Sequence, residues 1–509
     1  MPSTDRAAGD GARTAPDSRL HPMSSLFVLL QHLRQFVLPL VILLLFGRGD
    51  RNELWGLVAV TLLASASIWQ YYTYRYRIES GALVIRSGLL ERNARHIPFA
   101  RIHNVALRQT LLHRLFGVAE VRLESAGGRR PEAQMRVLSL PQALALEALI
   151  RDHAQQAAAP AGSDPAMAAP AQAQAETQVL LRLPTAEVVR LGLISNRGLV
   201  VVAGAFAAVS QVDRRLIGDL AERGGLALAR YFGAHTVSTA QAAITLALVV
   251  IVVLIGMRLL SVTLALLQYH DFTLRRQGRR LSVERGLLSR NRSNVPARRI
   301  QSWLLQEGVL QRAFERRSLQ VETAVAFSHS SEHALRELAP VATPQRCDAL
   351  AAELLGAALW PPREWQPIDR HAWWRMALPW LIASVWLAAA AAWRYGPSGW
   401  WLLSLGTLAL YTGWGHALRT GYSMGEELIA VRGGWWRRYW RFAERDKLQA
   451  LRLTRNPLDR ALGTATVWLD TAGSNPAHPA LRMRYLPMAR AQAMFDVLSA
   501  DIMRRPLRW

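Results

Sequence analysis

Charge-free apolar blocks that are long enough to cross a bilayer constrain this sequence more than any other feature. A helix of about 20 residues spans the roughly 30 Å hydrocarbon core of a membrane. Two weaker blocks, 36–47 beside Arg34 and 191–212 around Arg197, also qualify as spans if these long side chains reach the interface. The sequence therefore predicts six spans. The four blocks that lack any charged residue are 54–74, 236–257, 376–393 and 395–415.

The six spans fall into three pairs, and a long polar segment follows each pair. Because each pair returns the chain to the side it left, all three polar segments lie on one side of the membrane. The short connections inside the pairs carry seven arginines against five acidic residues, out of 61 basic and 37 acidic residues in the chain. Basic residues near spans favour the cytoplasmic side. We therefore predict a multi-pass protein of the bacterial inner (cytoplasmic) membrane, with its N-terminus and its polar segments in the cytoplasm.

The net charge of +24 and the pI of about 11.3 come almost entirely from arginine, since Lys447 is the single lysine. Such usage is typical of a coding bias rather than of selection for phosphate contacts, and we predict no nucleic-acid partner. The one cysteine, Cys347, excludes an internal disulfide framework and any multi-cysteine zinc site.

An internal repeat sets the architecture of the polar segments. Residues 87–105 and 285–303 share a Gly-Leu-Leu, an Arg-Asn, a proline and an Arg-Ile in one register, 198 positions apart. A third, more diverged copy follows 148 positions later, around 433–451. The repeating unit is one pair of spans plus one soluble domain, and it occurs three times.

Each soluble copy alternates apolar and polar residues with a period of two and then closes with a helical pattern after a proline: Pro141, Pro344 or Pro487. Short strands closed by one helix predict a small β-sandwich or partly open barrel. The predicted parts are a disordered tail (1–23), transmembrane pair 1 (24–74), domain 1 (75–154), an Ala/Pro-rich linker (155–189), transmembrane pair 2 (190–260), domain 2 (261–358), transmembrane pair 3 (373–418) and domain 3 (419–505).

The repeat resembles the membrane-anchored bacterial pleckstrin-homology (PH) family of the YdbS-like type, and three tandem units resemble its multi-domain, YdbT-like members. The third copy departs from the pattern, with Glu444 in place of the proline. The resemblance implies a multi-pass α-helical membrane protein with three all-β, PH-like sandwich or barrel domains, each capped by a C-terminal helix. It implies little about activity. The first copy supplies Tyr76, Ile78, Gly88, Leu89, Leu90, Ile97, Pro98, Arg101, Ile102, Gln109, Arg114, Leu115, Phe116, Gly117 and Val118 of the family pattern.

Arginines cluster around the repeated motif and form a candidate binding face. They would attract anionic lipid headgroups or an acidic protein, at about 1 kcal/mol for each charge near the surface. The alternative is a solvated strand face in an arginine-rich protein. The candidate residues are Arg92, Arg95, Arg101, Arg290, Arg292, Arg298 and Arg299.

In each copy an apolar doublet follows the glycine of the repeated motif. These doublets form a candidate tip that contacts the membrane or a partner. Tryptophans suit a membrane interface especially well. The alternative is that one residue of each doublet enters the core of its domain. The doublets are Leu89 with Leu90, Leu287 with Leu288, and Trp435 with Trp436.

No motif predicts catalysis, a cofactor or a metal. His329 and His333 are four residues apart, but the surrounding segment is turn-like and no third ligand is evident. We expect a non-enzymatic binding or scaffolding module, with membrane lipids and a protein, another membrane protein or a second copy, as partners. The alternative is a component of a transport, export or envelope-stress system in which the spans carry the activity.

Overall fold

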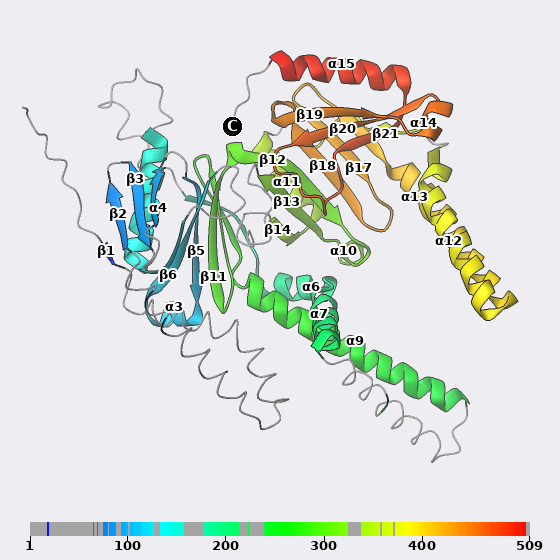
Figure 1. The fold of residues 1–509 in the computed structure, drawn as a ribbon, viewed down its shortest axis with the longest axis horizontal. Helices are drawn as coiled ribbons and strands as arrows, with labels where there is room; N and C mark the ends of the chain where they lie inside the picture. The colour runs from blue at the N-terminus through cyan, green and yellow to red at the C-terminus, as the bar shows by residue number, and fades with distance from the viewer. Residues whose placement is uncertain are drawn as a thin grey trace, which may run out of the picture. The chain divides into compact units, whose positions relative to one another are not determined.

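The computed structural model describes residues 18–19, 65, 69, 75–79, 81–87, 93–99, 102–125, 133–156, 177–212, 222, 239–323, 337–356, 359–369 and 372–504. Its contacts divide the chain into two compact units (Figure 1). The first unit holds Met1–Glu176 together with short segments of the second repeat, among them Ser289–Val295. The second unit holds most of the second repeat and all of the third.

Domain 1 in the first unit is all-β with one closing helix. Its apolar strand positions meet between the sheets, where Leu83, Val121 and Met135 are fully buried, and Leu146 of the closing helix packs on them. Alternation along the strands places these residues on one face. The elements are β1 (Ser18–Arg19), β2 (Arg75–Glu79), β3 (Ala82–Ser87) and β4 (Asn93–Pro98) in one sheet, β5 (Ile102–Thr110), β6 (Val118–Ser125) and β7 (Ala133–Ser139) in another, and helices α3 (Leu111–Leu115) and α4 (Leu140–Gln156).

Domains 2 and 3 repeat this plan within the chain. Domain 2 comprises β8 (Thr177–Arg182), β9 (Thr273–Gln277), β10 (Arg280–Arg285), β11 (Ser289–Pro296), η2 (Ala297–Arg299), β12 (Ile300–Glu307), α10 (Val309–Ala313), β13 (Arg317–Thr323), β14 (Glu337–Ala342) and α11 (Pro344–Leu355). Domain 3 comprises β15 (Gln366–Pro367), β16 (Gly421–Met424), β17 (Leu428–Gly433), β18 (Arg438–Glu444), η5 (Arg445–Lys447), β19 (Leu448–Thr454), α14 (Pro457–Ala461), β20 (Thr464–Thr471), β21 (Arg482–Pro487) and α15 (Met488–Arg504). The predicted closing helices after Pro141, Pro344 and Pro487 correspond to α4, α11 and α15.

Strands of consecutive repeats pair with one another. In the first unit β11 of the second repeat pairs antiparallel with β5 of the first, with Arg290 opposite Gln109. In the second unit β18 of the third repeat pairs antiparallel with β12 of the second, with Arg438 opposite Glu307. Gln109 and Glu307 are equivalent positions, 198 residues apart, in the first and second repeats. Arg290 and Arg438 are equivalent positions, 148 residues apart, in the second and third repeats. Both junctions therefore have the same register.

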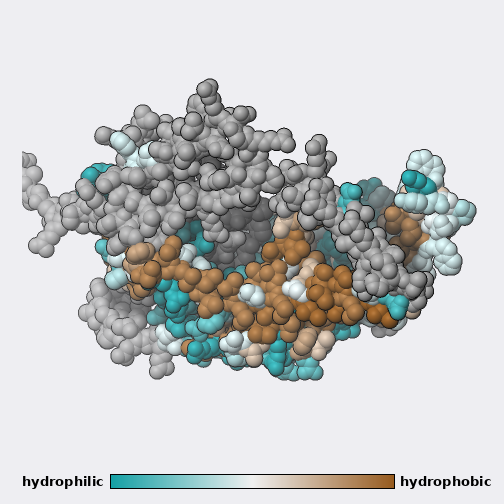
Figure 2. Space-filling model, turned by 90° about the horizontal axis from the view of Figure 1, so that it is seen from below, coloured by the Kyte–Doolittle hydropathy of each residue, from teal (hydrophilic) through white to brown (hydrophobic). Residues whose placement is uncertain are grey.

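The prediction of six spans is supported only in part. Of the described residues, two helices are long and apolar enough to cross a membrane, Ala243–Tyr269 within α9 (Thr239–Tyr269) and α12 (Trp373–Tyr395). Helices α6 (Thr185–Ile194) and α7 (Arg197–Val212) form a third candidate if they are one span bent by 52°. Transmembrane pair 1 lies almost entirely outside the described residues. Figure 2 looks at the molecule from below and shows apolar surface gathered along this helical side.

The second helix of pair 3 is shorter than predicted. Gly396 and Pro397 end α12, and the chain continues as the 3-10 helix η4 (Pro397–Leu403) before α13 (Ser404–Arg419) begins. The two α-helices approach each other closely at Gly413, where an added Cβ would lie 2.8 Å from the Cβ of Ala377. Small residues at such positions are typical of helices packed in membranes.

Two predicted boundaries differ from the structure. The linker 155–189 is too long at both ends, because α4 reaches Gln156 and the chain forms β8 and α6 from Thr177 onward. Domain 2 was placed from residue 261, but α9 continues to Tyr269 because its last turns stay apolar. Within the expected tail the described residues Ser18 and Arg19 pair with β2 instead of being disordered.

Candidate membrane-facing surface and interdomain network

The Leu287–Leu288 tip lies against the end of the α9 span. The backbone N–H of Gly286 donates to the carbonyl of His270 at 2.9 Å, and the N–H of Leu287 donates to the carbonyl of Leu267 at 3.0 Å. Both leucine side chains remain exposed. The β10–β11 turn is therefore fastened to the last turn of the span, with its apolar doublet open to the surroundings.

The Trp435–Trp436 tip occupies the same place beside the end of α13. The ring of Trp435 meets Tyr411 edge to face with centroids 5.6 Å apart, and the guanidinium of Arg419 lies 5.2 Å from its centroid. Gly415 makes this approach feasible, since an added Cβ would lie 2.4 Å from the Trp435 ring. Trp436 is 52% exposed. The doublet thus divides, with one ring packed on the helix and the other open.

The short helix after β12 extends the apolar surface beside this tip. Arg312 in α10 donates to the carbonyl of Trp436 at 3.4 Å, so the helix and the tip are neighbours. The helix and the residue after it leave large apolar side chains exposed. We call the set Val309, Leu310, Phe314 and Trp436 the apolar rim.

Of the apolar rim only Trp436 was predicted, although the repeat contains a signal for the other residues. The Leu-x-x-x-Phe spacing of Leu310 and Phe314 recurs as Leu112 with Phe116 in domain 1 and as Leu458 with Leu462 in domain 3, and all of these side chains are exposed. An apolar position that stays exposed in every copy serves something other than the core. The Leu89–Leu90 tip of domain 1 lies outside the described residues.

Ion pairs hold the helices of the membrane part to the soluble domains. Arg316, just after α10, donates two hydrogen bonds of 2.8 Å to Glu187 in the first turn of α6, and these contacts raise the pKa of Arg316. Arg375 in the first turn of α12 pairs with Asp459 of α14 and donates to Thr464 at 2.9 Å. Burial opposes ionisation of Asp459, but the hydrogen bond from Arg375 keeps its pKa below the usual value. Domain 2 and domain 3 are therefore each clamped to a helix of the pair that precedes them in the sequence.

Arg197, expected to reach the membrane interface, has protein partners instead. Its guanidinium donates to Gln268 at 2.6 Å and to the hydroxyl of Tyr269 at 2.6 Å, at the polar end of α9. Glu337 of β14 lies 4.0 Å away. The arginine therefore belongs to the junction between the span and domain 2.

The candidate arginine face is divided among different environments. Arg95 is exposed on β4, whereas Arg292 on β11 lies 3.9 Å from Glu147 of α4. Arg290 lies two residues earlier on β11, opposite Gln109. Arg299 is half-buried in η2, and burial lowers its pKa to about 10. Arg92 and Arg101 lie outside the described residues.

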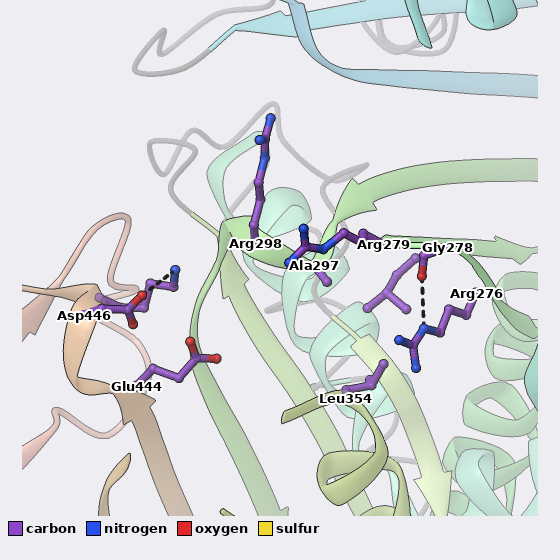
Figure 3. Close-up of a pocket in the computed structure, with 10 residues that line it drawn as sticks. Arg276, Gly278, Arg279, Ala297, Arg298, Leu354, Glu444 and Asp446 are labelled. Carbon is purple, nitrogen blue, oxygen red and sulfur yellow. Dashed lines mark hydrogen bonds and ion pairs between the residues drawn. The ribbon is translucent and has the colours of Figure 1, made fainter. Parts of the chain in front are cut away.

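Arg298 lines a pocket of about 730 Å³ in the second unit. The pocket is bounded by the β9–β10 turn, η2 and η5, and Figure 3 shows Arg279 beside Arg298 across from Glu444. Burial and the neighbouring Asp446 raise the pKa of Glu444, and Lys447 lies 3.3 Å from Asp446. The lining thus mixes both signs of charge, which suits a polar group better than a simple anion.

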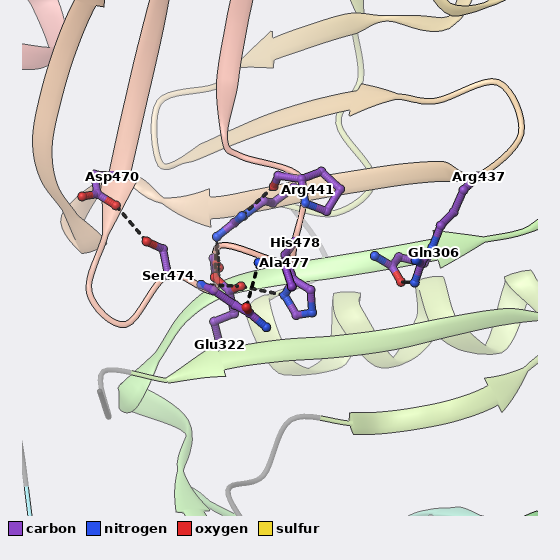
Figure 4. A network of polar contacts seen from close by, with 11 residues as sticks. Gln306, Glu322, Arg437, Arg441, Asp470, Ser474, Ala477 and His478 are labelled. Carbon is purple, nitrogen blue, oxygen red and sulfur yellow. Dashed lines mark hydrogen bonds and ion pairs between the residues drawn. The ribbon is translucent and has the colours of Figure 1, made fainter. Parts of the chain in front are cut away.

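A buried polar network joins domain 3 to domain 2 around Glu322 (Figure 4). Glu322 of β13 accepts from Ser302 at 2.7 Å, lies 2.7 Å from Nδ1 of His478, and pairs with Arg441 of β18. Arg441 also donates to the carbonyl of Pro479 at 2.6 Å. Burial would raise the pKa of Glu322, but the hydrogen bond from His478 and the charge of Arg441 outweigh it and lower that pKa.

Elsewhere in the described part of the chain, side chains that could bind a metal do not lie close together. No group of three or more His, Cys, Asp or Glu side chains there could hold a metal ion. His329 and His333 lie outside the described residues. Cys347 is buried in α11, and burial raises the pKa of its thiol to about 12.

Comparison with known proteins agrees with the three-domain plan. A sequence model of the family described as Bacterial PH domain matches residues 28–154, 226–355 and 376–502, which together make up more than half of the chain. The chain is also 22% identical over 316 residues to the UPF0699 transmembrane protein YdbT of Bacillus subtilis (strain 168). That alignment covers 58% of this chain, which spans 60% of the relative's length. No solved structure matches the chain.

Proposed function

This chain belongs to the bacterial PH domain family, and from that premise we propose that it is a non-enzymatic scaffold of the bacterial inner membrane, which presents three PH-like domains on the cytoplasmic side. Its domains bind at the membrane surface, where they engage anionic lipids and a protein partner. The observation that carries this proposal is the position of the apolar rim beside the end of α13.

The residue types of the apolar rim are those that proteins place at a membrane interface. Val309, Leu310 and Phe314 supply apolar side chains, and Trp436 supplies an amphipathic ring that suits the headgroup level. Arg312 and Arg419 lie next to the tip, where each basic residue contributes about 1 kcal/mol of attraction to an anionic leaflet. A surface of this kind keeps domain 2 and domain 3 against the bilayer that their spans enter.

The ion-pair clamps support scaffolding rather than loose tethering. Arg375 of α12 pairs with Asp459 of α14 in domain 3. Arg316, which follows α10 in domain 2, pairs with Glu187 of α6. A domain fixed in this way presents the same surface to its partners at all times, which lowers the entropic cost of binding.

One observation favours the alternative of a transport component. Helices α6 and α7 are bent by 52° around Ser195 and Asn196, and broken helices line the binding sites of many transporters. However, Arg258 of α9 donates to the carbonyls of Leu193 and Ser195 at 3.2 Å each. The polar groups that the bend frees are thus satisfied by the neighbouring helix, and a solute is not needed to explain the bend.

Charge reversal next to the tip tests the lipid-binding part of the proposal. We expect Arg312→Glu combined with a reversal of Arg437, the residue directly after Trp436 in the sequence, to reduce the anionic lipid that co-purifies with the intact protein. The second change is Arg437→Glu, and native mass spectrometry measures the bound lipid. The matched control is Arg490→Glu with Arg504→Glu on α15, which Figure 1 shows on the opposite side of the second unit from α9 and α12. Equal lipid retention by both double variants contradicts the proposal.

A reporter fused after residue 151 tests the orientation. A cytoplasmic reporter is the expected result. A periplasmic reporter overturns the assignment of the domains to the cytoplasm. Affinity purification of the intact protein followed by mass spectrometry then identifies the protein partner.

A further inference from the structure

At the two junctions between consecutive repeats, domain 1 and domain 2 are each completed by a strand from the next repeat. At the β12–β18 junction, Trp303 lies opposite Phe442, and the ring of Phe442 stacks on Trp303 and on Trp360, with centroid distances of 6.2 and 3.9 Å. Leu305 lies opposite Trp440, whose ring is 4.3 Å from the guanidinium of Arg317. The donated strand therefore supplies side chains to the core of the domain before it.

The receiving strand is covered as a result. All eight residues of β12 are buried. In domain 1, Val105 and Leu107 of β5 are buried in the same way, and Leu107 lies opposite Arg292 of β11.

Domain 3 has the receiving strand, β19, but no described strand pairs with it in the way that β11 pairs with β5 and β18 pairs with β12. Its β19 is the end strand of the sheet β19-β20-β21 among the described strands. Leu451 and Leu453, which correspond to the buried Trp303 and Leu305, pack on the domain core but are only half-buried. Arg452 between them is exposed. No described strand covers this edge as β11 and β18 cover the other two receiving strands.

Domain 1 has the complementary feature, a donor strand that no other repeat pairs with among the described strands. This strand is β4, an end strand of the sheet β1-β2-β3-β4, and it corresponds to β11 and β18. Ala94, Arg95 and His96 on β4 are exposed. Among the described strands, β4 and β19 are thus the donor edge and the receiving edge that no strand of another repeat pairs with.

We propose that β4 of one copy of this chain adds to β19 of a second copy, antiparallel and in the register of the two internal junctions. In that register Ala94 lies opposite Leu453, as Trp440 lies opposite Leu305. Backbone hydrogen bonds then complete the β19 edge, and the half-buried leucines gain the cover that they lack. Because donor and receiver differ, the contact is head-to-tail and extends into a closed ring or an open row along the membrane.

The charges at the two edges favour pairing of β4 from one copy with β19 of another. Arg95 of β4 stands at the position of Arg441, and Asp470 of β20 stands at the position of Glu322, so the proposed contact recreates the arginine–carboxylate pair of the β12–β18 junction. Asp470 is exposed and has Ser474 as a hydrogen-bond donor at 3.1 Å.

Arg452 weakens the contact relative to the internal junctions. Arg452 corresponds to Leu304, which lies opposite Arg441 in the internal junction. Because Arg95 corresponds to Arg441, Arg452 lies opposite Arg95 in the proposed register. Like charges directly opposite each other destabilise a strand pair by several tenths of a kcal/mol to about 1 kcal/mol. The association is therefore reversible, and its strength is adjustable at one residue.

Disulfide cross-linking of the full-length protein in its membrane tests the contact. Two differently tagged chains, one with Ala94→Cys and one with Leu453→Cys, are co-expressed and oxidised. Paired Cα atoms in an antiparallel sheet are about 4.5 to 5.5 Å apart, which lies within the range that a disulfide bridges. The native Cys347 does not interfere because it is buried.

We expect a covalent dimer that carries both tags, and none when Ala94→Cys is paired with Val497→Cys on α15. We also expect Arg452→Glu to raise the yield about fivefold by replacing repulsion with attraction. Asp470→Arg lowers the yield, and combining it with Arg95→Asp restores it.

Two results overturn the proposal. The first is a mixed-tag dimer yield no higher than that of the Val497→Cys control, in chains that are shown to be folded by their size-exclusion profile. The second comes from a further variant that carries both cysteines in one chain. If the cross-link forms only within that chain and not between two chains, β4 pairs with β19 of the same copy.

Discussion

Arg441 of β18 donates a hydrogen bond to Glu322 of β13, and the two side chains are only 3% and 5% exposed. This contact joins the third repeat to the second. Breaking a buried ion pair by removing one partner costs about 3 to 5 kcal/mol, because the remaining charge stays buried and uncompensated. The pair therefore stabilises the contact between the third repeat and the second.

We predict that Glu322→Leu destabilises the second unit by about 3 kcal/mol. The measurement is denaturant unfolding of the intact protein in detergent, followed by tryptophan fluorescence, since Trp303 and Trp360 lie at the same junction. The double variant Glu322→Leu with Arg441→Met should recover most of the loss, because no charge remains unpaired.

A matched control for this prediction is the exposed pair of Arg182 and Asp271, whose side chains are 72% and 45% exposed. Such pairs contribute about 0 to 1 kcal/mol, so Arg182→Ala should change the free energy of unfolding little. Equal losses in Glu322→Leu and Arg182→Ala would contradict the structural role of the buried pair.

Acid should weaken the same junction. The pKa of Glu322 is lower in the folded protein than the ordinary carboxyl value of 4.5, so its ionised form contributes stability that is present above about pH 4.5 and is lost as the pH falls through the folded pKa. The groups that face Glu322 are Arg441, His478, Ser302 and the backbone N–H of Asn475.

Acid unfolding of the wild type and of Glu322→Gln measures this contribution. We expect the wild type to lose more stability than the variant below about pH 4.5, because the amide does not titrate. Parallel pH profiles for the two proteins would show that Glu322 does not carry the effect.

Close packing of α12 on α13 gives a prediction within the membrane part. An added methyl group at Gly413 meets Ala377 at 2.8 Å and the carbonyl of Trp373 at 2.9 Å, so Gly413→Ala should destabilise the helix pair by about 1 to 3 kcal/mol. Gly256 in α9 has open space around the same position, and Gly256→Ala should be neutral or slightly stabilising. Thermal unfolding in detergent compares the two variants, and a Gly413→Ala protein as stable as Gly256→Ala would argue against this packing.

The repeat predicted the number of domains, their order and their closing helices. It also placed the Leu287–Leu288 and Trp435–Trp436 doublets in equivalent positions, and the structure puts the first beside the end of α9 and the second beside the end of α13. These features follow from local patterns, because a proline at a helix start or a glycine at a turn acts within a few residues.

The strand pairing between repeats could not be predicted from the same patterns. Arg290 opposite Gln109 and Arg438 opposite Glu307 lie in different copies, and tandem repeats present the same edges to their own domain and to the next one. The choice is made by side chains such as Phe442, which fits against Trp303 and Trp360. The partners of Arg197 were likewise not predictable from local pattern, because Gln268 and Tyr269 lie 71 and 72 positions away in the sequence.

The position of the apolar rim at the bilayer is the central claim, and a fluorescent label at Leu310 tests it most directly. Leu310→Cys is labelled with an environment-sensitive nitrobenzoxadiazole group and the intact protein is placed in anionic nanodiscs. The native Cys347 stays unlabelled because burial raises the pKa of its thiol to about 12. Val497→Cys on α15 provides the matched exposed control.

We predict blue-shifted emission from the Leu310→Cys label and strong quenching by a quencher carried on the lipid chains, whereas the label on Val497→Cys emits as in water and is not quenched. The same spectrum and the same quenching at both positions would contradict the account, because the apolar rim would then face water rather than the membrane.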